Sequence, residues 1–251
     1  MARPRVLVTG FGPFPGAPEN PSASLAEALG AARWPGYELH AHVLPTEWEA
    51  VAGLAPRLYA RLQPDVMIHF GLCQRAVRFR IERSAYNRAA PRADARAALP
   101  AGRHVVAQGP ERLDTHVPPA QLAAHLSAHG LPAASSRSAG RYLCNFLYYH
   151  SLAWAARQQA APVALFVHVP RTVAQGGLFS DASLLQGAQE VVRFVLDFAA
   201  RRDVHPIASD PLSPCGGARS RDGASGGGLN PSPFPLPRGE RGSPHALKRE
   251  R

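Results

Sequence analysis

The stretch Arg5-Val-Leu-Val-Thr-Gly-Phe-Gly-Pro-Phe-Pro-Gly16, followed by Asn20-Pro21-Ser22, decides the fold class of this 251-residue chain. Its first five residues are a short apolar run typical of a buried strand, and the glycines and prolines after it predict a turn. Asn20 followed by Pro21 is a helix start, and we expect that helix to end near Gly30. A strand that feeds a helix through a short loop is the building unit of an α/β sheet.

The same alternation continues along the chain. Further strands are predicted over residues 37–44, 65–70, 77–83 and 163–169. Helices are predicted from the capping-box spacing Thr46-Glu-Trp-Glu49 to about Leu62, over 118–129, from Cys144 onward, and over 181–201. Strands interleaved with helices indicate a mainly parallel, twisted sheet covered on both faces, with functional sites at the carboxyl ends of strands.

The last part of the chain differs in composition. Residues 206–251 contain eight prolines and eight glycines, including Gly226-Gly-Gly228 and Pro231-Ser-Pro-Phe-Pro-Leu-Pro237. Such a composition cannot form a packed core. We expect a folded domain over residues 1–205 and a disordered tail over 206–251. A functionless extension is favoured for the tail over a polyproline segment that binds a partner.

The ends and the thiols of the chain bear on its compartment. Met1 is followed within five residues by an apolar strand, which leaves no room for a signal peptide, and no apolar run approaches the ~20 residues of a membrane span. Cys73, Cys144 and Cys215 are too scattered for a disulfide framework or a metal knuckle. The eleven histidines show no metal-ligand spacing. We expect a globular cytoplasmic protein without a metal or cofactor and away from membranes.

The formal charge of +10 raises nucleic acid as a possible partner. However, the tail contributes +3 of that charge, and no dense basic stripe occurs in the rest of the chain. The local cluster Arg75, Arg78, Arg80 and Arg83 alternates with apolar residues, as in a strand with one solvated face. A solvated face is therefore favoured over phosphate binding, and nucleic-acid binding is kept as an alternative.

Cys144 is the most informative single residue. It opens an apolar helix in the run Ser138-Ala-Gly-Arg-Tyr-Leu-Cys144-Asn145. A thiol near a helix start feels the positive end of the helix dipole and unpaired backbone N–H groups, which favour thiolate. A lone cysteine is more often a small core residue, so the nucleophile hypothesis depends on partners.

Two partners are available. His168 lies one residue before the end of its predicted strand, separated from Cys144 by one helix and one strand, so the thiol and the imidazole can meet at one edge of the sheet. Glu82, near the end of the strand 77–83, is the candidate carboxylate that orients the imidazole. The alternatives are a core histidine and a surface ion pair between Glu82 and a nearby arginine.

Four sequence blocks resemble pyroglutamyl peptidase I, also called pyrrolidone-carboxylate peptidase. They are Thr9-Gly-Phe-Gly-Pro-Phe14 with Asn20-Pro-Ser22, Glu82-Arg-Ser-Ala-Tyr-Asn87, Ser138-Ala-Gly-Arg-Tyr-Leu-Cys-Asn145 and Phe166-Val-His-Val-Pro170. The resemblance spans about residues 5–200 and excludes the tail. It implies a three-layer α/β/α sandwich and a cofactor-free cytosolic cysteine peptidase, often a homotetramer, that removes N-terminal pyroglutamate from peptides.

The resemblance also implies roles for individual residues. The family's nucleophile, histidine and acid fall on Cys144, His168 and Glu82. Its lactam pocket is lined at positions matching Phe11, Phe14, Tyr142 and Leu143, and an arginine of the family matches Arg92. The chain departs from the family where Arg88-Ala-Ala-Pro-Arg92 lacks acidic residues and where Leu72 replaces a frequent glutamine.

These residues predict acyl transfer. Cys144 attacks the pyroglutamyl carbonyl, backbone N–H groups at the helix start stabilise the oxyanion, and His168 protonates the leaving amine. A catalytically inactive relative that binds N-acylated peptides is the main rival, motivated by the altered loop over 88–98.

Overall fold

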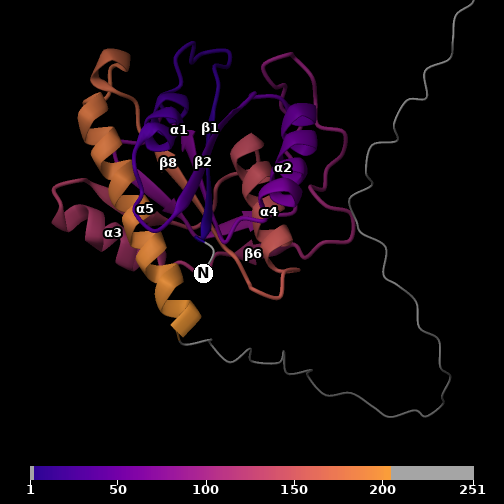
Figure 1. The fold of residues 1–251 in the computed structure, drawn as a ribbon. Coiled ribbons are helices and arrows are strands. Elements are labelled where there is room, and N and C mark those ends of the chain that lie inside the picture. The colour runs from indigo at the N-terminus through magenta and orange to yellow at the C-terminus, as the bar shows by residue number, and fades with distance from the viewer. Residues whose placement is uncertain (1–2, 205–251) are drawn as a thin grey trace, which may run out of the picture. The chain divides into compact units, whose positions relative to one another are not determined.

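The computed structural model describes residues 3–204 (Figure 1). Its strands are β1 (Arg5–Phe11), β2 (Glu38–Leu44), β3 (Val66–Leu72), β4 (Phe79–Glu82), β5 (Ser84–Tyr86), β6 (Arg112–Asp114), β7 (Ala133–Ser136) and β8 (Val163–Val169). Its helices are α1 (Pro21–Ala31), α2 (Trp48–Leu62), α3 (Pro119–Ala128), α4 (Leu143–Ala155), the short 3₁₀ helix η1 (Val173–Gln175) and α5 (Asp181–Val204). The predicted alternation of strands and helices is therefore confirmed over this part of the chain.

The main sheet has the strand order β2-β1-β3-β8-β4-β7. Figure 1 shows α1, α3 and α5 on one face of this sheet and α2 and α4 on the other. Every strand pair of this sheet is parallel except β4 with β8, and β5 and β6 form a separate antiparallel pair. The predicted α/β/α sandwich with a mainly parallel sheet is confirmed.

The central strands are apolar because helices cover both of their faces. All seven residues of β8 are buried, as are six of the seven in β1 and in β3. A hydrophobic core cluster fills the space between the sheet and the α1, α3 and α5 layer, with contributions from Val8, Ile68, Leu122 and Val191. This core fixes the strand ends on which the functional side chains stand.

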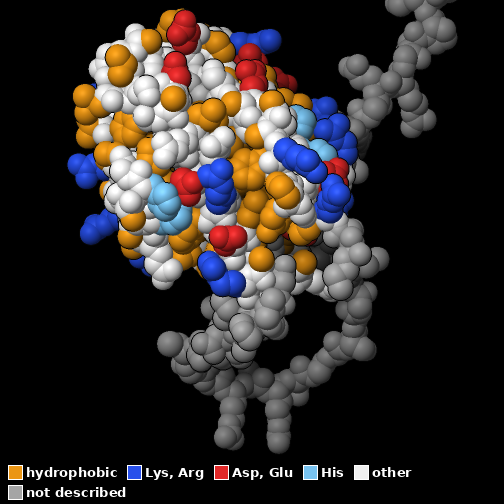
Figure 2. All heavy atoms as spheres, turned by 60° about the vertical axis from the view of Figure 1, so that its left-hand side comes forward, with side chains coloured by type: hydrophobic (Ala, Val, Ile, Leu, Met, Phe, Trp, Pro, Cys, Tyr) orange, Lys and Arg blue, Asp and Glu red, His pale blue; other side chains and the backbone are white. Residues whose placement is uncertain are grey.

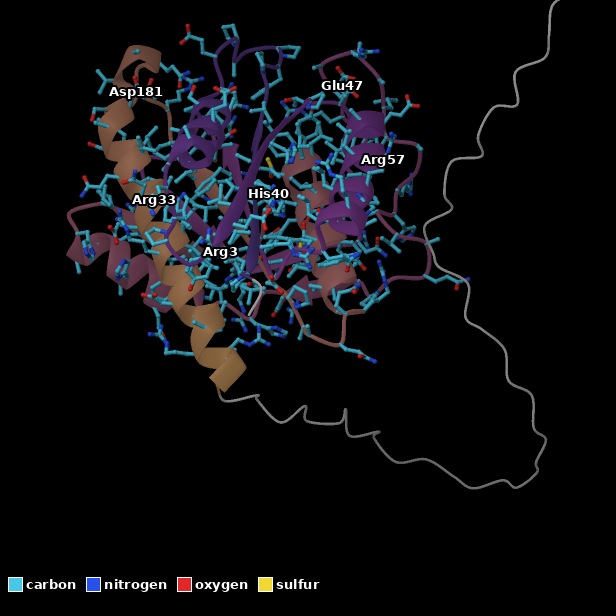
Figure 3. All side chains as sticks on the ribbon, viewed as in Figure 1. Arg3, Arg33, His40, Glu47, Arg57 and Asp181 are labelled. Atoms are coloured by element: carbon cyan, nitrogen blue, oxygen red, sulfur yellow. The ribbon has the colours of Figure 1, made fainter. Side chains whose placement is uncertain are left out.

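The carboxyl ends of the parallel strands meet at one end of the molecule. In Figure 3, Glu47, which precedes α2, and Asp181, the first residue of α5, lie at this end, while Arg3 before β1 lies toward the other. One close approach at this edge requires glycine. A Cβ at Gly10 would lie 1.9 Å from the Ser22 carbonyl oxygen, so only glycine lets β1 end against the start of α1.

The antiparallel pair β4–β8 sets an important register. Arg80 lies opposite His168, and Glu82 lies opposite Phe166. Because side chains alternate along a strand, Arg80, Glu82 and His168 share one face of the sheet. The strand β7 pairs parallel to β4 and therefore runs antiparallel to β8, so β7-α4-β8 is not a parallel crossover.

Several expectations from the sequence need correction. The capping box at Thr46 is wrong: the Thr46 hydroxyl donates to the Gly12 carbonyl, and the start of α2 has no side-chain cap from its own N-cap residue Glu47. The strand predicted over 77–83 covers only 79–82. The short strands β5, β6 and β7 were not predicted, because three or four residues with weak alternation give no periodic signal.

The surface of the molecule carries both basic and acidic side chains. On the face in Figure 2, Lys and Arg side chains are scattered among acidic and hydrophobic ones. Among the residues that the structure describes, no helix is both long and apolar enough to cross a membrane. The predictions for residues 206–251, including Cys215, lie outside the described residues.

Candidate active site

The thiol of Cys144 stands at the start of α4. Tyr142 is the N-cap of this helix, and Cys144 is its second residue. No side chain caps α4 within residues 3–204, and Phe146 is the first residue whose N–H bonds back to the Tyr142 carbonyl. The helix start therefore offers backbone N–H donors beside the thiol, where negative charge is favoured.

Gly71 leaves the space that the thiol occupies. A Cβ on Gly71, near the end of β3, would lie 3.0 Å from Cys144 Sγ and 2.8 Å from Phe166 Cζ. These separations are shorter than ordinary contacts of a methyl group. Glycine at this position is thus required for α4 to bring Cys144 against the sheet.

His168 and Glu82 form a buried hydrogen-bonded pair. Nδ1 of His168 donates to Oε1 of Glu82 over 2.8 Å, which leaves Nε2 as the nitrogen available to the thiol. Glu82 is completely buried, and His168 is 8% exposed. The pairing follows from the β4–β8 register, which puts both side chains on one face, two residues apart along the ladder.

The charge of His168 is set by its two partners. Burial of the ring works against protonation, but the nearby Cys144 and Glu82 outweigh it and raise the pKa of His168 above its ordinary value of 6.5. The imidazole is therefore held in its charged form beside the sulfur. A cysteine beside an imidazole that a carboxylate orients is the arrangement of a cysteine nucleophile and its proton donor.

Cys144 and His168 open into a cavity of about 580 Å³. The cavity brings together all the predicted pocket residues: Phe11, Phe14, Arg92, Tyr142 and Leu143 line it along with the thiol and the imidazole. Leu72, noted as a departure from the family, also lines it. Glu82 does not line the cavity, because it is buried on the far side of His168, to which it is hydrogen-bonded. Every predicted site residue therefore either lines the cavity or contacts a residue that does.

The loop over 88–98 is fastened to the cavity wall. The Arg92 guanidinium lies 4.6 Å above the centre of the Tyr142 ring, and the Tyr142 hydroxyl donates to the Ala93 carbonyl. The Trp48 indole N–H donates to the Arg92 carbonyl, and its ring meets Tyr142 edge-on. Loss of acidic residues at 88–92 therefore leaves a loop with defined contacts.

Two polar residues that organise this loop were not predicted. Buried Asp94 accepts hydrogen bonds from the N–H groups of Trp48, Arg96 and Ala98, and so caps α2 from a distant loop. Although burial opposes its charge, these bonds lower the pKa of Asp94 below 3.8. Sequence spacing cannot find a cap that lies 46 residues from its helix.

Asn145 is the second residue that the sequence analysis did not assign. It follows Cys144 and is fully buried; its amide bonds the N–H and carbonyl of Tyr86 and the carbonyl of Arg88. It therefore ties the start of α4 to β5. Its place directly after Cys144, in the block Ser138–Asn145, was the signal in the sequence that could have indicated this role.

Arg80 differs from its predicted role in a solvated face. It is half-buried and lines the cavity, where its guanidinium donates to the Ser136 hydroxyl and lies 3.4 Å from Glu82 Oε1. The ion pair considered as an alternative for Glu82 thus exists. It coexists with the His168 hydrogen bond, because Oε1 receives both donors.

Several known proteins resemble this chain in sequence. A profile described as pyroglutamyl peptidase matches residues 4–182. The chain is 36% identical over 170 residues to a pyrrolidone-carboxylate peptidase of Chromobacterium violaceum, covering 66% of this chain and 77% of that one. It is 33% identical over 177 residues to pyroglutamyl-peptidase 1 of Rattus norvegicus, covering 68% and 81%.

Solved structures show the same fold. A mutant pyrrolidone carboxyl peptidase from Pyrococcus furiosus superposes with a TM-score of 0.74 at 27% identity, covering 78% of this chain and 99% of that one. The profile match extends from the start of β1 into α5, and so includes every element of the cavity. The chain belongs to the pyroglutamyl peptidase family.

Proposed function

We propose that this protein removes the N-terminal pyroglutamyl residue from peptides by acyl transfer to Cys144. One observation carries the proposal: a thiol at an uncapped helix start and a carboxylate-bound imidazole open into the same cavity, whose walls include two phenylalanines. The names of the relatives support the substrate class.

The cavity suits a pyroglutamyl group. Its lactam is a small, flat, uncharged ring, so aromatic faces such as Phe11 and Phe14 can bury it without leaving a charge unpaired. Tyr142 and Leu143 directly precede Cys144, so they line the cavity beside the position of the acyl carbon that the thiol attacks. The lactam N–H and C=O require hydrogen-bonding partners, which nearby backbone groups can supply.

The chemical steps use the pair in turn. The Cys144 thiolate forms a bond to the pyroglutamyl carbonyl carbon, and the resulting oxyanion is stabilised by N–H groups at the start of α4. His168 then gives a proton from Nε2 to the departing amine as the C–N bond breaks. The neutral imidazole next takes a proton from water, whose hydroxide cleaves the thioester, and the thiolate and imidazolium are restored.

Glu82 acts through His168. Its hydrogen bond fixes the Nδ1–H form and holds the ring orientation, and its charge stabilises the imidazolium before each proton transfer. It contacts neither thiol nor cavity, so we assign it a positioning role.

Three further features belong to the same proposal. We infer a homo-oligomer, a tetramer by resemblance, that works in the cytoplasm without a cofactor. The resemblance of the four sequence blocks supports these features. Size-exclusion chromatography with light scattering tests the oligomer directly.

The decisive experiment follows release of the fluorophore from a pyroglutamyl fluorogenic amide. Cys144→Ala should abolish turnover and retain the fold, since it removes the nucleophile and little volume. Cys73→Ala is the matched control, because this second thiol lines the same cavity without a histidine–carboxylate partner, and should retain turnover. A folded Cys144→Ala protein with the wild-type rate would refute the proposal. Binding of the substrate by the wild type without any release would favour an inactive relative instead.

A further inference from the structure

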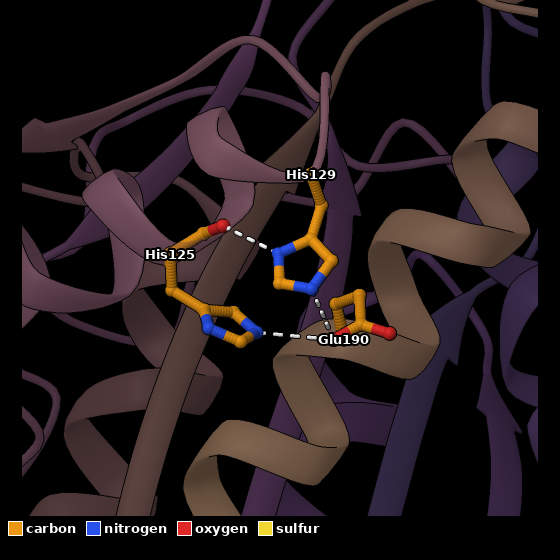
Figure 4. A group of neighbouring side chains, drawn as sticks. All are labelled: His125, His129 and Glu190. Atoms are coloured by element: carbon orange, nitrogen blue, oxygen red, sulfur yellow. Dashed lines mark hydrogen bonds and ion pairs between the residues drawn. The ribbon is translucent and has the colours of Figure 1, made fainter.

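Three potential metal ligands meet on the opposite face of the sheet from Cys144. His125 lies on α3, His129 is the residue that ends α3, and Glu190 lies on α5. Figure 4 shows the two imidazoles and the carboxylate pointing toward one another. The expectation that no histidines have metal-ligand spacing overlooked His125 and His129, which are four residues apart on one face of a helix. The third ligand, Glu190, follows His125 by 65 residues, and only the fold brings it to the pair.

The ligand atoms converge on a single point. His125 Nε2 lies 3.0 Å from Glu190 Oε2, and His129 Nε2 lies 3.9 Å from the same oxygen. All three ligand atoms lie within 4.8 Å of one another. Bonds of ~2.1 Å to a tetrahedral Zn²⁺ place ligand atoms about 3.4 Å apart, which lies between the two observed distances.

The surrounding contacts hold the ligands in place. His129 Nδ1 donates to the His125 carbonyl over 2.8 Å, which leaves the Nε2 lone pair directed at the cluster. Such a bond from the remote nitrogen to a carbonyl is typical of histidines that bind metals. Phe194 packs against the His125 ring, and Arg193 holds Oε1 of Glu190, which leaves Oε2 for a cation.

We propose that His125, His129 and Glu190 form a binding site for a first-row transition-metal dication of the Zn²⁺ class. Two imidazoles and one carboxylate are ligands that Zn²⁺ prefers, and the half-exposed rings leave room for a water as the fourth ligand. The metal joins the end of α3 to the middle of α5. Since the unfolded chain separates these ligands, binding stabilises the folded state.

The experiment measures Zn²⁺ binding by calorimetry and the melting temperature of the full chain. Thiols are first alkylated, because Cys144 with His168 would itself bind Zn²⁺. We expect one saturable site per chain and a melting temperature raised by roughly 5–10 °C at about 100-fold excess over Kd.

Variants locate the binding. His129→Ala and Glu190→Gln should each weaken Zn²⁺ binding at least about 10-fold. His40→Ala is the matched control, because His40 also contacts a glutamate, Glu38 at 3.0 Å, and its removal should leave Zn²⁺ affinity unchanged. Absence of saturable binding to the wild type, or equal affinity in all three variants, would overturn the proposal.

A separate observation concerns the catalytic cavity. Besides His168, its charged lining residues are Arg75, Arg80, Arg92 and Arg141, and no Asp or Glu of the described residues lines it. Arg75, Arg92 and Arg141 are exposed, and none forms an ion pair with an acidic side chain of the described residues. The buried carboxylate of Glu82 is already bound to His168 and Arg80.

We infer that the cavity selects peptides with Asp or Glu directly after the pyroglutamyl residue, an inference that rests on the proposed function. The lactam carries no charge. The positive potential of the arginines therefore acts on the rest of the substrate, the peptide released after cleavage. Arginine side chains pair well with carboxylates, and an unpaired positive rim also speeds encounter with anionic substrates.

The test compares kcat/KM for pyroglutamyl peptides that differ only by Asp or Asn in the second position. We expect at least a severalfold preference for Asp that shrinks in high salt, and a smaller ratio in an Arg75→Gln, Arg141→Gln double variant. Cleavage of neither peptide would refute the proposed function. Equal cleavage of both would refute only the preference.

Discussion

Replacing Glu82 by Gln isolates the contribution of its charge. The amide keeps the size of the side chain, and its oxygen can still accept the bond from His168 Nδ1 at the Oε1 position. The amide nitrogen then falls at the Oε2 position, which is buried and has no hydrogen-bonding partner among the described residues. The variant thus loses one charge and gains one buried donor without an acceptor.

Both changes have a calculable size. A hydrogen bond to a charged group contributes about 1.5–3 kcal/mol and a neutral one about 0.5–1.5 kcal/mol. The variant should therefore lose about 1–2 kcal/mol of transition-state stabilisation, which lowers kcat/KM roughly 5- to 30-fold. The buried unsatisfied N–H should lower the free energy of unfolding by about 1–3 kcal/mol.

The pH profile gives the sharper result. Glu82 is one of the groups that raise the pKa of His168, so its neutralisation must lower that pKa. The active ion pair needs a protonated imidazole, which is lost as the pH rises through the pKa of His168. The alkaline limb of kcat/KM should therefore move to lower pH in Glu82→Gln.

The assay is release from a pyroglutamyl fluorogenic amide between pH 5 and 10, with urea unfolding in parallel. Glu38→Gln is the matched control, because it neutralises another glutamate that contacts a histidine, 3.0 Å from His40 on β2, and should leave the kinetics unchanged. An unchanged alkaline limb in a folded Glu82→Gln protein would refute the charge argument.

Four further predictions concern the helix α4, the loop over 88–98, the cavity and the last part of the chain. Gly71→Ala should lower kcat/KM at least about 10-fold, because its Cβ would lie 3.0 Å from the Cys144 sulfur; wild-type kinetics would show that α4 can shift freely. Asp94→Asn should lower the unfolding free energy by about 1–2 kcal/mol at pH 7, and the difference should shrink as the pH falls below 3.8, measured by urea titration. Phe11→Ala and Phe14→Ala should each raise KM and lower kcat/KM, and unchanged steady-state kinetics in both would locate the lactam elsewhere. Deletion of residues 206–251 should leave folding and turnover nearly unchanged, and loss of more than half the activity would contradict it.

The sequence predicted the layers of the fold because periodicity reports burial. The apolar runs of β1, β3 and β8 are covered on both faces, and the predicted strands match them to within two residues. The sequence could not predict that β4 runs antiparallel to β8. Strand direction depends on the path of the connections, which no residue in 79–82 encodes.

The sequence predicts those residues of the candidate site whose role depends on their type and on their place within one helix or strand. Cys144 at a helix start and His168 at a strand end are local features, and the fold brings them to one cavity. Arg80, Asp94 and Asn145 were not found, since their roles depend on partners 56, 46 and 59 residues away. A polar residue whose partner is distant has the same local pattern as one on a solvated surface.

Two histidines of the main sheet show what decides catalytic character. His69, in the middle of β3, and His168, near the end of β8, each stand between apolar residues of a buried strand, so their local sequences are alike. His69 is bound by the hydroxyls of Thr9 and Ser151, both at 2.7 Å, and burial without a countercharge lowers its pKa to about 3.

His168 is also buried, yet its pKa moves in the opposite direction because a carboxylate and a thiol replace the two hydroxyls. Burial alone keeps an imidazole neutral and inert; burial beside Glu82 keeps it charged and able to give a proton. Introducing a carboxylate beside His69 by Thr9→Asp should therefore raise the His69 pKa, measurable by NMR titration. It should not create a second site, because His69 is fully buried and does not line the cavity that holds Cys144.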